Sequence, residues 1–95
     1  MTPEGKVKED IKIFLEDIGA WFYMPIPMGY GRKGIPDFIV CYKGQFIGIE
    51  AKAPGKEDDV TPWQEKELNA ILDAGGYSYL ISDVTVLKKL MYAIQ

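Results

Sequence analysis

The first apolar residues of the chain recur with helical spacing and predict a helix over residues 3–18. Thr2 is suited to the N-cap, Pro3 to the first helical position, and Gly19 to the position after the last turn. The apolar residues form one stripe: Val7, Ile11, Phe14, Leu15 and Ile18. Such a stripe is typical of a helix that packs one face against a core.

Three runs rich in β-branched and aromatic residues predict strands over residues 20–24, 37–42 and 45–52. Lys43-Gly44 separates the last two runs and favours a two-residue hairpin turn. The Pro- and Gly-rich residues before the second strand predict a long loop, and long loops in a small domain are often functional.

The second half of the chain predicts a polar loop over 53–60, a helix over 61–74, a strand over 77–81 and a helix over 83–94. The predicted order is α-β-β-β-α-β-α in a single domain over residues 1–95. This order indicates an α/β or α+β domain in which helices flank a mixed central sheet.

A two-residue turn at Lys43-Gly44 fixes the register of the hairpin and places Asp37 opposite Glu50. Residues directly opposite on antiparallel strands share a face, with Cβ atoms roughly 5 Å apart. Lys52 follows Glu50 by two positions and therefore points to the same face. Because two like charges so close destabilise a sheet, we expect a divalent cation to bind between the two acids.

Composition narrows the chemistry, since the chain has no histidine and only one cysteine, Cys41. The Ser-His and Cys-His nucleophile pairs are excluded, and an ordinary zinc site cannot be assembled. The ligands of a bound metal would therefore be oxygens, which indicates Mg²⁺, with Mn²⁺ as a substitute. Mg²⁺ held by carboxylates beside a lysine suits phosphodiester hydrolysis, because it activates water and neutralises charge at phosphorus.

Two further polar residues have more than one interpretation. The helical projection places Glu4 on the inner stripe of the first helix, near the expected site, although a first-turn acid also stabilises the helix dipole. Gln64 lies three residues after Thr61, which is the spacing of a capping box. Both the structural and the site interpretation stay open for each residue.

The net charge of -3 argues against nucleic acid as a ligand, but its distribution weakens the objection. Residues 1–56 hold 8 Lys/Arg against 7 Asp/Glu, whereas residues 57–95 hold 3 against 7. Affinity for nucleic acid depends on local basic patches more than on total charge. The loops on either side of the hairpin carry the candidate DNA contacts: Arg32, Lys33, Tyr30 and Lys56.

The sequence Gly34-Ile35-Pro36-Asp37, followed by Ile49-Glu50-Ala51-Lys52, resembles the motif of the PD-(D/E)XK nucleases, which share a restriction-endonuclease-like core. The run E-A-K-A-P-G-K from Glu50, with Gln64 in the next helix, resembles the virus-type replication-repair nuclease (VRR-NUC) domain in its stand-alone form. The resemblance extends from Glu4 to the strand at 77–81. At Ala51 the family commonly has a larger β-branched residue, but only the backbone would matter there.

The resemblance implies a Mg²⁺-dependent deoxyribonuclease, an endonuclease that acts as a homodimer on branched DNA such as Holliday junctions, in DNA repair. The residues it implies for catalysis are Asp37, Glu50, Lys52, Glu4 and Gln64. Asp37, Glu50 and the backbone carbonyl of Ala51 would bind the metal, with Glu4 as an additional acid. Lys52 would position the attacking water, and Gln64 would support the site.

Two other functions are compatible with the same residues. The chain could be a catalytically inactive DNA-binding module with a nuclease fold, or an exonuclease or nickase on ordinary DNA. We expect no leader, because no charged-then-apolar segment opens the sequence, and no apolar run is long enough to span a bilayer. We expect a cytoplasmic protein of a bacterial or phage-infected cell that is not secreted, contacts no membrane and uses no nucleotide cofactor.

Overall fold

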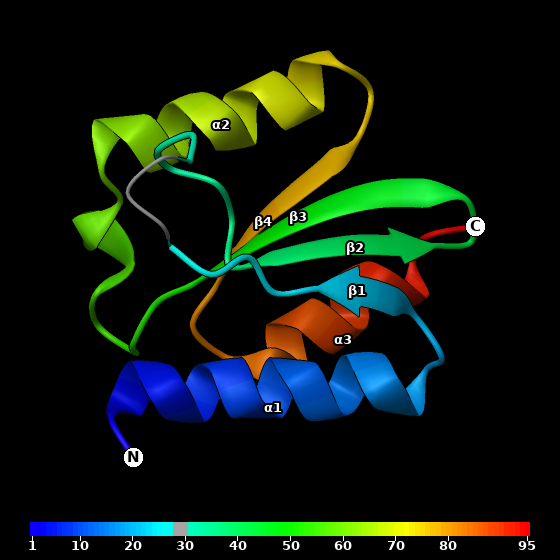
Figure 1. Cartoon of the computed structure of the whole chain (residues 1–95). Helices are drawn as coiled ribbons and strands as arrows, with labels where there is room; N and C mark the ends of the chain where they lie inside the picture. The colour runs from blue at the N-terminus through cyan, green and yellow to red at the C-terminus, as the bar shows by residue number, and fades with distance from the viewer. Residues whose placement is uncertain (28–30) are drawn as a thin grey trace.

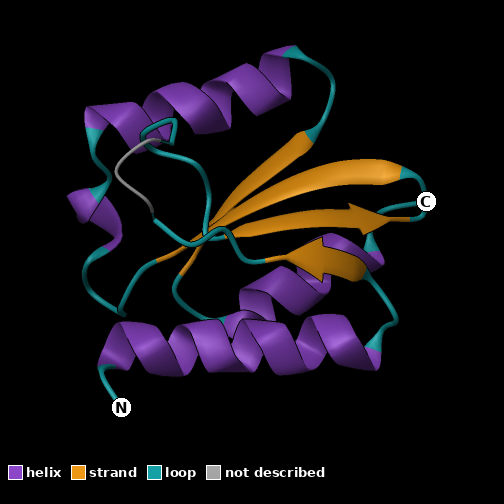
Figure 2. Cartoon of the chain, in the orientation of Figure 1, coloured by secondary structure: helices purple, strands orange, loops and turns teal. Residues whose placement is uncertain are grey.

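The computed structural model describes residues 1–27 and 31–95. Tyr30, one of the expected DNA contacts, lies outside the described residues. The elements are α1 (Pro3–Asp17), β1 (Trp21–Tyr23), β2 (Phe38–Tyr42), β3 (Gln45–Ala51), the 3-10 helix η1 (Glu57–Asp59), α2 (Pro62–Asp73), β4 (Tyr77–Ile81) and α3 (Val84–Tyr92). Except for η1, which forms within the expected loop over 53–60, they follow the predicted order (Figure 2).

A four-stranded mixed sheet in the order β1-β2-β3-β4 forms the middle layer (Figure 1). β1, β2 and β3 pair antiparallel, and β4 pairs parallel to β3. A parallel pair needs a crossover connection, which α2 supplies. α2 lies on one side of the sheet, and α1 and α3 lie on the other (Figure 1). The predicted mixed sheet flanked by helices is therefore confirmed.

The hydrophobic core lies mainly between the sheet and the layer of α1 and α3. The hydroxyl of Thr2 accepts a hydrogen bond from the backbone N–H of Gly5 at 3.0 Å, so α1 begins at the predicted cap. The apolar stripe predicted for this helix is buried, with Ile18 packed at its margin. The strands, α3 and the residues after α3 complete the core with Phe38, Val40, Ile47, Ile49, Ala51, Ile81, Leu87, Met91 and Ile94.

The β2–β3 hairpin has the predicted register and differs from the prediction only at its open end. Ile39 lies opposite Gly48. Lys43 and Gly44 form the turn with φ angles of 51° and 76°, the two left-handed residues that a type I′ turn requires. The hydrogen-bonded ladder stops one residue short of Asp37, which therefore precedes β2 instead of beginning it. This leaves the Asp37 side chain free to turn toward the end of β3.

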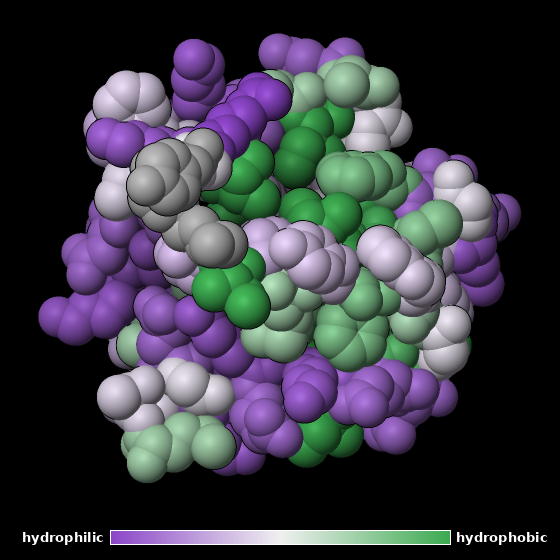
Figure 3. Space-filling view, in the orientation of Figure 1, coloured by the Kyte–Doolittle hydropathy of each residue, from purple (hydrophilic) through white to green (hydrophobic). Residues whose placement is uncertain are grey.

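The other face of the sheet is only partly covered by α2. Figure 3 shows hydrophobic side chains gathered on this open side of the molecule. A groove of about 390 Å³ lies between α2 and the sheet, lined by Arg32, Ile35, Pro36, Ile39, Phe46, Glu67, Ala70, Ile71, Ala74 and Gly76. Among the residues of α2, only the acid Glu67 is buried. Arg32 of the loop before β2 pairs with Glu67, so α2 contacts this loop as well as the strands. Within the described ranges, no helix is long and apolar enough to cross a membrane.

Candidate functional site

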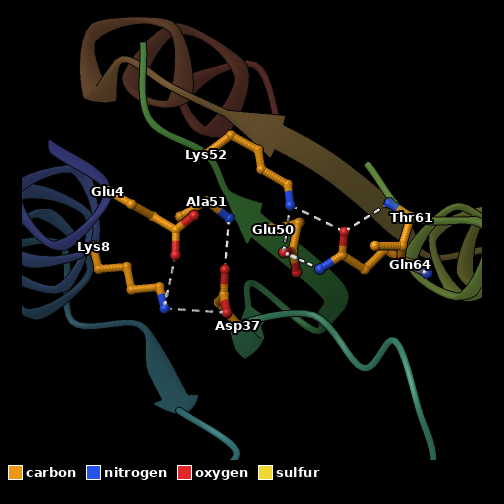
Figure 4. A network of polar contacts seen from close by, with 8 residues as sticks. All are labelled: Glu4, Lys8, Asp37, Glu50, Ala51, Lys52, Thr61 and Gln64. Carbon is orange, nitrogen blue, oxygen red and sulfur yellow. Dashed lines mark hydrogen bonds and ion pairs between the residues drawn. The ribbon is translucent and has the colours of Figure 1, made fainter. Parts of the chain in front are cut away.

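The residues expected to form an active site meet at the C-terminal end of β3 (Figure 4). β3 supplies Glu50 near its end, and Lys52 follows directly after it. Asp37 enters from the residue before β2, Glu4 from the first turn of α1, and Gln64 from the first turn of α2. Four separate segments thus bring their polar side chains together at the end of the sheet where β3 terminates.

Asp37 is anchored to the backbone of the neighbouring strand. Its Oδ2 accepts a hydrogen bond from the backbone N–H of Ala51 at 2.9 Å. The contact extends the register of the hairpin, with a carboxylate in place of a backbone carbonyl. It leaves Oδ1 as the oxygen of Asp37 that lies near the ammonium of Lys8.

Glu50 carries its carboxylate into the interior, with only 3% of the residue exposed. Its Oε2 accepts a hydrogen bond from Nε2 of Gln64 at 2.9 Å, and Nζ of Lys52 lies 3.8 Å from the same oxygen. Among the described residues, Oε1 has no hydrogen-bond partner. Burial, reinforced by the charge of Asp37 and opposed by that of Lys52, raises the pKa of Glu50 to about 7.

We expect Glu50→Gln to stabilise the metal-free protein at pH 8. Glutamate in the unfolded chain loses its proton near pH 4.5, whereas buried Glu50 keeps it to about pH 7. The folded state therefore binds more protons between these values, and the free energy of unfolding falls as pH rises through this window. The loss is on the order of 3 kcal/mol, and an uncharged amide avoids it while still accepting the bond from Gln64.

Urea unfolding of both proteins with chelator, at pH 5 and at pH 8, measures this effect. The advantage of the variant should be much larger at pH 8 than at pH 5. An equal difference at the two pH values would contradict the account of a buried, destabilising charge.

Gln64 connects the helix cap to the charged residues. The hydroxyl of Thr61 accepts from the backbone N–H of Gln64 at 3.1 Å, and the backbone N–H of Thr61 donates to Oε1 of Gln64 at 3.0 Å. The same Oε1 accepts from Nζ of Lys52 at 3.1 Å. The amide of Gln64 therefore completes the predicted capping box and also joins Lys52 to Glu50.

Glu4 reaches the site through a lysine that the sequence analysis did not single out. Nζ of Lys8 lies 3.4 Å from Oε2 of Glu4 and 3.5 Å from Oδ1 of Asp37. Burial acts to lower the pKa of Lys8, but the charges of Asp37 and Glu4 outweigh it and raise the pKa above its ordinary value. The i,i+4 spacing from Glu4 was the signal that could have identified Lys8, because such residues share a helix face.

Three of the expected DNA contacts, Arg32, Lys33 and Lys56, lie in loops among the described residues. Arg32 forms two contacts with the buried Glu67, from Nε to Oε2 at 2.6 Å and from Nη2 to Oε1 at 2.8 Å. The ammonium of Lys33 lies 5.3 Å from the ring centre of Trp63. Lys56 is exposed at the start of η1. Arg32 and Lys33 therefore hold their loop against α2, a role that the sequence did not predict.

The carboxylates of Glu50 and Asp37 are suited to bind a divalent cation. Glu50 presents a buried carboxylate oxygen without a partner, which costs free energy unless a proton or a cation compensates it. Oδ1 of Asp37 is also an oxygen ligand. Within residues 1–27 and 31–95, no three acidic side chains are grouped closely enough to hold a metal by themselves. Mg²⁺ keeps several waters and needs few protein ligands, so two carboxylates suit it.

Comparison of the sequence with models of protein families and with curated proteins finds no match. Comparison of the structure finds similarity to a solved structure described as a VRR_NUC domain. The TM-score is 0.75, the sequence identity is 22%, and the match covers 100% of both chains. The chain therefore has the fold of a VRR_NUC domain, and the predicted fold is confirmed.

Proposed function

We propose that this chain is a metal-dependent DNA endonuclease with its active site at Asp37, Glu50 and Lys52. The observation that carries the proposal is the buried carboxylate of Glu50. One of its oxygens has no partner among the described residues, and it lies beside a second carboxylate and a lysine. A buried carboxylate is not needed to stabilise the fold, whereas carboxylates with a shifted pKa are typical of catalytic sites. The VRR_NUC fold agrees with a nuclease.

Asp37 and Glu50 would hold Mg²⁺ or Mn²⁺, with the backbone carbonyl of Ala51 as a further ligand and Glu4 as an additional acid. The ion would supply charge neutralisation at the phosphate and lower the pKa of a bound water. Lys52 would place its ammonium beside the attacking water. Gln64 accepts from this ammonium at 3.1 Å and donates to Glu50 at 2.9 Å, so it fixes the separation of the lysine and the carboxylate.

DNA would bind across the loops that flank the site. Lys33 and Lys56 are exposed, and each carries a charge that can contact a phosphate. Arg32 is 71% exposed, so some of its N–H groups stay available despite the ion pair with Glu67. The resemblance of the motif favours branched DNA as the substrate and a homodimer as the active form.

Cleavage of four-way, flap, single-stranded and linear DNA of matched sequence, side by side in Mg²⁺, tests the substrate. We expect the four-way and flap substrates to be cut faster than the linear duplex, at internal positions. Release of single nucleotides from ends would indicate an exonuclease instead. Single nicks in linear duplex at an equal rate would contradict the preference for branched DNA.

A further inference from the structure

We infer that Lys8 is an internal counter-ion of the metal site, and that a divalent cation binds Asp37 only by displacing its ammonium. The inference rests on the proposed function, because it assigns a role to Lys8 at the same site. It makes Lys8 a residue that sets metal affinity, in contrast to the catalytic role proposed for Lys52.

The two oxygens of Asp37 are not equally available to a cation. Oδ2 accepts from the backbone N–H of Ala51 at 2.9 Å, a contact that orients the carboxylate. Oδ1 is therefore the oxygen open to a further ligand. Nζ of Lys8 lies 3.5 Å from this atom. The ammonium thus faces the oxygen that a metal would need.

Lys8 also balances the charge of a second acid. Its Nζ lies 3.4 Å from Oε2 of Glu4, so the ammonium stands between the carboxylates of α1 and of the loop before β2 (Figure 4). Glu50, the third acid, is close enough to both that their charges raise its pKa. Without a cation the three acids repel one another, and Lys8 offsets part of that repulsion.

The geometry of Lys8 suits a contact that can be exchanged. Its two ion pairs are longer than the 2.7–2.9 Å of a strong charge-assisted hydrogen bond. About a third of its side chain is exposed, and a lysine stem can rotate its ammonium into solvent. Lys52 differs, because it is buried and donates to Gln64 at 3.1 Å. Of these two lysines, Lys8 is the one that can leave at low cost.

A divalent cation and an ammonium that share one carboxylate oxygen repel each other strongly where solvent is partly excluded. Metal binding must therefore include the work of moving Lys8 away. Removing the ammonium should therefore increase the affinity of the site for the metal. The same substitution removes one positive charge from a domain proposed to bind DNA. This increase separates a competing counter-ion from a lysine that merely supports the site.

Lys8→Met tests the inference, with Lys6→Met as the matched control. Lys6 lies on the same helix, forms one i,i+4 ion pair with Asp10 at 2.6 Å, and carries the same charge. Calorimetric titration with Mn²⁺, without DNA, measures the dissociation constant of each protein. We expect Lys8→Met to bind about tenfold more tightly than the unmodified chain or better, and Lys6→Met to change affinity by less than about threefold.

Two outcomes overturn the inference while leaving the proposed function intact. Lys8→Met could bind Mn²⁺ with unchanged or weaker affinity, although circular dichroism shows it folded. In the unmodified protein, the side-chain NMR signals of Lys8 could stay in place when saturating Mg²⁺ is added. Failure of the proposed function gives a different result. In that case neither the unmodified chain nor Lys8→Met shows Mn²⁺ binding that the Glu50→Gln substitution abolishes. The role inferred for Lys8 is then wrong as well.

Discussion

Lys52→Ala should abolish DNA cleavage while leaving the fold and DNA binding intact. A positioned proton donor or acceptor contributes about 100-fold to 10,000-fold to a hydrolysis rate, and we expect a loss of that size in the rate of cleavage. The fold should survive because Lys52 follows the last residue of β3 and is not part of the apolar core. Gln64 keeps its bonds to Thr61 and Glu50 when the ammonium is removed.

Lys12→Ala is the matched control for this prediction. Lys12 is an exposed residue of α1 and carries the same charge, but it takes no part in the polar network around Glu50. Single-turnover rates in Mg²⁺ and DNA affinity in Ca²⁺ should be measured for both variants. The control should retain its rate, and full activity of Lys52→Ala would remove Lys52 from the active site.

Gly34→Ala should destabilise the protein and also impair the site. Gly34 has a φ of +80°, and a Cβ there would lie 2.3 Å from both the carbonyl carbon and oxygen of Trp63, and 2.7 Å from the nitrogen of Gln64. These atoms are backbone of the first turn of α2, so the helix or the loop must move. Backbone strain and overpacking together should lower the free energy of unfolding by about 2–5 kcal/mol. Because Gln64 belongs to that turn, cleavage by the folded fraction should fall as well.

Gly44→Ala separates the two causes. Gly44 has a similar φ of +76°, but no atom of the described residues lies within 4 Å of a Cβ at this position. It therefore bears the backbone strain alone, about 1–2 kcal/mol, and should cleave DNA normally. Urea unfolding of the two variants gives the difference. Equal losses of stability would show that the close approach of Gly34 to α2 adds nothing.

Much of the fold follows from local sequence signals. The spacing of apolar residues and the Thr2 cap predict α1, and the two-residue turn at Lys43-Gly44 sets the hairpin register that the structure confirms. Strand alternation then brings Glu50 and Lys52 to the same side. These features could be predicted because each depends on residues near one another in the chain.

The rest of the site depends on contacts between distant segments. The backbone contact of Asp37 arises only because the ladder ends one residue early. Lys8 meets Asp37 across 29 positions, so helix periodicity could place Lys8 on the inner face but could not name its partner. The pairing of Arg32 with Glu67 is of the same kind, since a buried acid on a largely polar helix is visible only after α2 has been placed.

The metal dependence of cleavage tests the central proposal most directly. The purified chain should be incubated with a labelled four-way junction in Mg²⁺, in chelator, and in chelator followed by excess Mg²⁺, with Glu50→Gln alongside. The proposal predicts internal cuts with Mg²⁺, none with chelator, recovery on returning the metal, and no cuts by the variant. Equal cleavage with chelator, or by Glu50→Gln, would contradict it, and binding without cleavage under every condition would indicate a DNA-binding module.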